Sequence, residues 1–124
     1  MKRISHNALQ KLEQQSTLEF FCELETTPIK GNVSKVNPET DAYLEKHVEE
    51  SLTRGNQWAW CTVWVRASFR GYHGAASLGC CSYRNESEAR ADVYEDLKYD
   101  ALSDLAGKLF DSLTLFHLIE MGLL

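Results

Sequence analysis

The segment spanning residues 58–69 carries all three tryptophans of the chain and alternates with the period of a β-strand. Read with a period of two, the side that begins at Trp58 also holds Trp60 and Trp64. The opposite side is apolar from Ala59 to Phe69. A strand of a half-buried sheet needs only one apolar face. The tryptophan face is therefore either covered within the fold or a surface that meets a partner.

This segment is expected to form a hairpin with the one that follows it. Gly71 and Gly74 separate two extended runs, which is typical of a connection of about four to five residues. We predict a small antiparallel sheet whose central hairpin comprises residues 57–69 and 75–83. Residues 17–25 also alternate and are interpreted as a third strand. The alternative for that stretch is one long helix that aligns Leu9, Leu12, Phe20 and Leu24.

Helical periodicity predicts three helices, over residues 5–15, 39–53 and 86–121. The expected apolar stripe of the second is Tyr43, Leu44, His47, Val48 and Leu52. The expected stripe of the third is Tyr94, Leu97, Ala101, Leu105, Leu109 and Leu113. No linker or repeat interrupts the chain. We therefore predict a single α+β domain over residues 1–124, with the sheet packed by helices 39–53 and 86–121.

Charge is concentrated in one predicted helix. Residues 85–111 hold eight acidic and three basic residues, which accounts for the whole net charge of −5. Direct binding of nucleic acid requires a basic patch, so this distribution argues against it. The chain has no apolar run of about 18 residues and no secretory signal core at its start. We therefore expect no membrane partner and a cytoplasmic location in a bacterial host.

Within that helix, aspartates recur at every fourth position from Asp92 to Asp104. Successive carboxylates lie about 6 Å apart along a helix axis and repel one another. One interpretation is a solvated helix face; the other is a surface that offers negative charge to a basic partner, as a phosphate backbone does. Aromatic and arginine residues are enriched at binding hot spots and extend the second interpretation. The candidate partner-binding residues are Asp92, Glu95, Asp96, Asp100, Asp104, Trp58, Arg70 and Tyr72.

The end of the chain is apolar nearly all round, which requires burial by its own domain or by another chain. This pattern keeps a second function class open, a structural or regulatory module that forms a homodimer. The candidate dimerisation residues are Leu113, Phe116, Leu118, Ile119 and Leu123.

Catalytic and metal-binding patterns are weak. The four cysteines follow no Cys-x-x-Cys spacing and are interpreted as free thiols of the core. His73, Cys80 and Cys81 are close in sequence, but the two cysteines would point to opposite faces of a strand, so no zinc site is expected. No nucleophile elbow, phosphate-binding loop or paired carboxylates are present. We expect a non-enzymatic protein without metal or cofactor.

Several short motifs resemble a group of short proteins encoded by bacteriophages, plasmids and related mobile elements. They are Pro28-Ile-Lys-Gly31-Asn32, Asp41-Ala-Tyr43, Gly55-Asn-Gln-Trp58-Ala-Trp60-Cys61, Gly71-Tyr-His-Gly74, Leu78-Gly-Cys80-Cys81-Ser-Tyr83 and Tyr94-Glu-Asp96-Leu97. The resemblance covers residues 28–106 and implies a genomic setting, not an activity. Small acidic proteins of such elements often block CRISPR effectors or restriction enzymes. Our leading hypothesis is therefore an anti-CRISPR-like inhibitor whose acidic helix occupies the basic channel of a defence nuclease.

Overall fold

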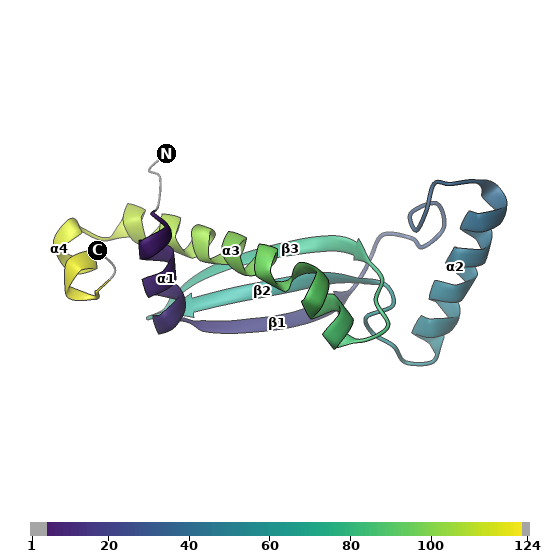
Figure 1. The fold of residues 1–124 in the computed structure, drawn as a ribbon, viewed down its shortest axis with the longest axis horizontal. Coiled ribbons are helices and arrows are strands. Elements are labelled where there is room, and N and C mark those ends of the chain that lie inside the picture. Colours follow the sequence, from purple (N-terminus) through teal and green to yellow (C-terminus); the bar gives the residue numbers. More distant parts are fainter. Residues whose placement is uncertain (1–4, 123–124) are drawn as a thin grey trace. The chain divides into compact units, whose positions relative to one another are not determined.

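The computed structural model describes residues 5–122. In chain order the elements are α1 (His6–Gln15), β1 (Thr17–Leu24), α2 (Pro38–Thr53), β2 (Cys61–Phe69), β3 (Tyr72–Cys81), α3 (Glu86–Ser112) and α4 (Leu115–Glu120) (Figure 1). The strands form an antiparallel sheet in the order β1-β2-β3. This architecture confirms the predicted α+β class, and residues 17–24 are a strand and not part of a long helix.

The described residues divide into two compact units. Unit 1 comprises residues up to 20, residues 65–76 and residues from 95 onward; unit 2 comprises residues 21–64 and 77–94.

Unit 1 has a core of helix and strand side chains. α1 begins at Ser5, whose hydroxyl accepts a hydrogen bond from the Ala8 amide at 3.1 Å. The buried side chains of unit 1 come from α1, from every second position of β2, from one stripe of α3 and from α4. They are Ala8, Leu9, Leu12, Val65, Ala67, Phe69, Leu97, Ala101, Leu102, Leu105, Ala106, Leu109 and Leu118. The predicted stripe of the long helix is thus confirmed from Leu97 to Leu109.

The hairpin turn is shorter than predicted. β2 ends at Phe69 and β3 begins at Tyr72, so only Arg70 and Gly71 connect them. Both have positive φ, 46° and 84°, as a two-residue type I′ turn requires. Gly74 lies inside β3 and not in the turn. A Cβ at Gly74 would collide with the backbone of α3 at Ala101 and Leu105, so this glycine is required by close packing of the helix on the strand.

Unit 2 contains the tryptophans, and their arrangement differs from the predicted strand. Residues 57–60 form turns before β2, so Trp58 and Trp60 do not alternate along a strand. Both are buried, and the Trp60 indole donates a hydrogen bond to the Thr27 carbonyl at 2.7 Å. Trp64 lies on the half-exposed face of β2 and stacks on Phe21, with ring centroids 6.4 Å apart. The segment 58–69 therefore has two apolar sides because its first residues form a turn that buries Trp58 and Trp60 in the core.

α2 buries much less than its predicted stripe implies. Asn37 caps its N-terminus, because the Asn37 side chain accepts a hydrogen bond from the Thr40 amide at 2.8 Å, and Pro38 is its first residue. Val48 is its buried residue, whereas Tyr43 is 71% exposed. In Figure 1 this helix lies beyond the ends of the strand segments of unit 2, so it does not cover those segments as predicted.

The predicted helix over residues 86–121 is interrupted. α3 ends at Ser112, and Thr114 adopts an extended conformation and caps α4, its hydroxyl accepting from the His117 amide at 3.3 Å. Among the helices of residues 5–122, none has the length and apolar character needed to cross a bilayer.

Candidate functional site

The candidate acids lie on the exposed side of α3, because the buried stripe of the helix faces the core. Asp96, Asp100 and Asp104 belong to unit 1, as does Glu95, whereas Asp92 belongs to unit 2. All five are exposed. The contacts of these carboxylates divide the set into acids that serve the fold and acids that face outward.

Asp104 caps an edge of the sheet. Its carboxylate accepts from the Ala75 amide at 3.0 Å and pairs with Lys108 at 3.3 Å. Lys108 in turn donates to the His73 carbonyl at 2.8 Å. β3 is an edge strand, whose free amides and carbonyls would otherwise invite pairing with another chain. Asp104 and Lys108 together occupy one donor and one acceptor of that edge.

Glu95 belongs to an ion triad between two helices. Lys98 on α3 contacts Glu95 at 2.8 Å and Glu13 of α1 at 3.2 Å. The hydrogen bond that Lys98 donates to Glu95, and then the one that it donates to Glu13, raise the pKa of Lys98 against the opposing effect of burial. The triad links α1 to α3 and leaves one uncompensated negative charge.

Asp92 is engaged in unit 2. It accepts a hydrogen bond from the Tyr83 hydroxyl at 2.6 Å. Burial, followed by this hydrogen bond to the carboxylate, raises the pKa of Tyr83. The aspartate thereby fixes the segment after β3 to the first turns of α3.

Asp96 and Asp100 differ from the other acids. Within residues 5–122, no hydrogen bond or ion pair reaches either carboxylate. Tyr99 lies between them in sequence and is 55% exposed. These three residues form what we call the α3 outer face, and they present two carboxylates and an aromatic ring to solvent.

The other candidate partner-binding residues are dispersed. Trp58 is 8% exposed and belongs to the core of unit 2, so its ring is not available as a surface. Arg70 is exposed at the hairpin turn, its guanidinium 5.4 Å from the centroid of the Phe69 ring. Tyr72 is half-buried at the start of β3. A binding role for Arg70 and Tyr72 stays a prediction.

The candidate dimerisation residues divide in the same way. Phe116 and Ile119 on α4 are exposed by 66% and 55%, whereas Leu118 is buried. Leu113 is half-buried, and Leu123 lies outside the described residues. α4 is therefore anchored through Leu118 and presents Phe116 and Ile119 to solvent.

One structural feature has no motif in the sequence, the carboxylate of Glu25 in unit 2. Its Oε1 accepts from the Cys80 amide at 2.6 Å and from the Thr62 hydroxyl at 3.1 Å. Its Oε2 accepts from the amides of Thr26 and Thr27 at 2.9 and 3.3 Å. The amide of Cys80 first, and then that of Thr27, lower the pKa of Glu25 to about 2. Cys80 itself has a positive φ of 55°, so the carboxylate holds a strained residue of β3 in place.

The thiols of unit 2 are all reduced. Cys61 and Cys81 are buried, Cys22 is half-buried and Cys80 is exposed. Burial, with the neighbouring thiols of Cys22 and Cys81, raises the pKa of Cys61 to about 12, so this thiol is a poor nucleophile at neutral pH. Within residues 5–122, no three His, Cys, Asp or Glu side chains converge on a point that could hold a metal ion.

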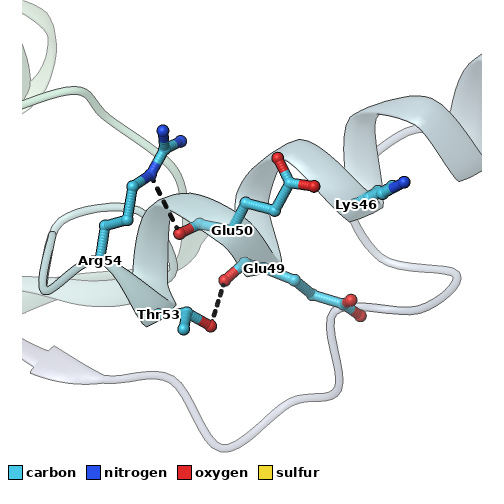
Figure 2. Close-up of a pocket in the computed structure, with 5 residues that line it drawn as sticks. All are labelled: Lys46, Glu49, Glu50, Thr53 and Arg54. Carbon is cyan, nitrogen blue, oxygen red and sulfur yellow. Dashed lines mark hydrogen bonds between the residues drawn. The ribbon is translucent and has the colours of Figure 1, made fainter.

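Two of the surface hollows lined by described residues have volumes above 300 Å³. The first, of about 440 Å³, lies on α2 and is lined by Lys46, Glu49, Glu50, Thr53 and Arg54. Figure 2 shows that Arg54 and Thr53 turn back to the carbonyls of Glu50 and Glu49, so they close the end of the helix. Two basic and two acidic side chains balance in charge, and none of the five lining residues is of an apolar type, so this hollow offers little to a ligand.

The second hollow, of about 370 Å³, lies in unit 1 between α1 and α3. It contains the ion triad, and its lining is His6, Leu9, Gln10, Glu13, Glu95, Lys98, Tyr99 and Leu102. Tyr99 thus belongs both to this hollow and to the α3 outer face. Comparison of the chain with protein-family models, with curated proteins and with solved structures finds no match.

Proposed function

We propose that this protein is a non-enzymatic binding protein that docks the α3 outer face on a basic surface of another protein. The observation that carries the proposal is the pair Asp96 and Asp100, which are exposed and have no internal partner within residues 5–122. The other candidate acids of α3, Asp92, Glu95 and Asp104, each contact another residue of the chain.

The energetics support an external role for this pair. Like charges four residues apart destabilise a helix by a few tenths of a kcal/mol, and aspartate is a poor former of helix interiors. A basic partner would convert this cost into charge-assisted contacts and into faster, steered association. The adjacent Tyr99 supplies the aromatic contact area that binding hot spots favour.

The class of partner is proposed from the resemblance to proteins of phages and plasmids. A defence nuclease, such as a CRISPR effector or a restriction enzyme, carries a channel lined by Lys and Arg that accepts nucleic acid. In the proposed mechanism the α3 outer face enters that channel and excludes the nucleic acid. Because the contact is electrostatic, raised salt weakens it.

A plasmid-transformation assay in bacteria with an active defence nuclease tests this proposal. The chain should restore transformation by a targeted plasmid, and D96N/D100N should reduce that rescue by about tenfold or more, the effect of about 1.4 kcal/mol of lost affinity. The matched control is E49Q/E50Q, which removes two exposed acids from α2. Equal rescue by D96N/D100N and by the wild type would contradict the proposal, provided circular dichroism shows that both variants are folded.

The second candidate function is self-association through α4. It is favoured by the exposure of Phe116 and Ile119 beside the buried Leu118. Light scattering of the full chain and of F116S/I119S tests it. A dimer that the double substitution converts to a monomer would support this function, and a monomeric wild-type chain would rule it out.

A further inference from the structure

We infer that the hollow between α1 and α3 receives an arginine side chain of the partner protein. This inference rests on the proposed function, because it names the residue type through which the partner engages the region beside the α3 outer face. The two helices lie side by side in unit 1 (Figure 1), and each contributes four residues to the lining of the hollow.

The floor of the hollow is apolar. Leu9 of α1 and Leu102 of α3 line it, and both are buried among their own neighbours. An arginine side chain has an aliphatic stem that packs on such a surface while its charged end remains near water. At about 370 Å³ the hollow has room for an arginine side chain.

The rim is negatively charged. Glu13 and Glu95 both contact the same ammonium, that of Lys98, whose side chain is 18% exposed. One cation therefore compensates two carboxylates. Each ionised carboxylate has about four acceptor positions, so both retain sites for further donors. A second cation at the rim complements this charge, whereas an anion would be repelled.

Tyr99 selects the kind of cation. Its exposed ring lines the hollow next to Glu95 in the helical repeat. A guanidinium stacks on an aromatic face and donates in a planar fork to carboxylates, which an ammonium cannot do. No three metal-ligating side chains converge within residues 5–122, so the hollow has no geometry for a metal ion. These features together fit arginine.

The inference is tested by NMR titration of the ¹⁵N-labelled full chain with the tripeptide acetyl-Gly-Arg-Gly-amide. Saturable shifts are expected in residues 6–13 and 95–102. The same peptide with lysine should bind several-fold more weakly, and the peptide with citrulline, which is neutral, should not bind. Tyr99→Leu and Glu13→Gln should each weaken binding by about threefold to fivefold. Glu49→Gln, on α2, should leave it unchanged.

Three results would overturn the inference: no saturable shift, shifts spread over exposed acids elsewhere in the chain, or equal binding of the arginine and citrulline peptides. D96N/D100N separates this inference from the proposed function, because these residues do not line the hollow. If D96N/D100N loses rescue and neither it nor the wild-type chain binds the tripeptide, the proposed function stands and the arginine site fails. If it keeps full rescue and still binds the tripeptide, the hollow binds arginine but the proposed function fails.

Discussion

Replacing Glu25 by glutamine is expected to destabilise unit 2, because both carboxylate oxygens accept hydrogen bonds. Oε1 accepts from Cys80 and Thr62, and Oε2 accepts from Thr26 and Thr27. A glutamine amide has one oxygen, so in either orientation its NH₂ group would face at least one backbone donor. Part of the connection from the end of β1 across β2 to the strained residue of β3 would be lost.

The size of the effect follows from the pKa of Glu25, which is about 2 in the folded chain against an ordinary 4.5. Without screening by solvent, this pKa difference corresponds to about 3 kcal/mol of stabilisation of the folded chain with Glu25 ionised. The carboxylate is partly open to solvent, which screens it, so we expect Glu25→Gln to cost about 1–2 kcal/mol at neutral pH. The matched control is Glu23→Gln, two residues earlier in β1, where the side chain is exposed and the cost should lie within about 0.5 kcal/mol.

Urea unfolding followed by tryptophan fluorescence measures the effect, since Trp58, Trp60 and Trp64 lie in the same unit as Glu25. The folded pKa is depressed, so the stabilisation is complete above the unfolded pKa and decreases as the pH falls toward the folded one. The gap between wild type and Glu25→Gln should be constant from about pH 7 to pH 5 and should shrink between about pH 4.5 and pH 2. A gap equal to that of Glu23→Gln, or one independent of pH, would refute the reasoning.

Four further predictions concern the fold. Gly74→Ala should lower the stability of unit 1 by about 2–3 kcal/mol in thermal unfolding, because its Cβ would meet the main chain of α3. Gly107→Ala, with open space around its Cβ, should raise stability by up to about 1 kcal/mol in the same assay. Asp104→Asn should cost about 1 kcal/mol in urea unfolding, since it weakens the cap of the β3 edge. In timed alkylation read by mass spectrometry, the exposed Cys80 should react first, and Cys61 only on unfolding.

Periodicity in the sequence predicted the elements whose faces are strictly alternating or helical. Residues 17–25 alternate except at Phe21, and residues 17–24 form β1 despite the helical alternative. The stripe from Leu97 to Leu109 repeats every fourth residue, and it is buried in α3. Such elements are predictable because the pattern follows from local backbone geometry and requires only that some apolar surface covers the apolar face.

Boundaries and turns were less predictable, because one residue type serves several physical purposes. Gly71 supplies a positive φ in the hairpin turn, whereas Gly74 makes room for α3. The two glycines lie three residues apart in the sequence. They differ in that α3, which follows later in the chain, packs against Gly74 and not against Gly71. Arg70 at a positive φ is a further departure, since asparagine or glycine is the usual residue there. Thr114 caps α4, but it lies within an apolar run that predicted one continuous helix.

Electrostatic roles were the hardest to predict, because the partners of a carboxylate lie far away in sequence. Glu25 contacts the Cys80 amide, 55 residues later, and Asp104 contacts the Ala75 amide, 29 residues earlier. The spacing of the aspartates on α3 is visible in the sequence, but nothing in that spacing separates a capping acid from an outward-facing one.

The contacts of the aspartates on α3 therefore divide them into two groups, whose substitution should have different effects on stability. Removing Asp92 or Asp104 takes a hydrogen-bond acceptor from the fold, so any loss of binding in such variants would be confounded by loss of stability. Removing Asp96 or Asp100 relieves repulsion along α3 and should leave stability unchanged or slightly higher. A loss of partner binding in D96N/D100N without a loss of stability would thus be a direct sign of a docking surface. The same substitutions with no effect on binding would make the pair a solvated helix face.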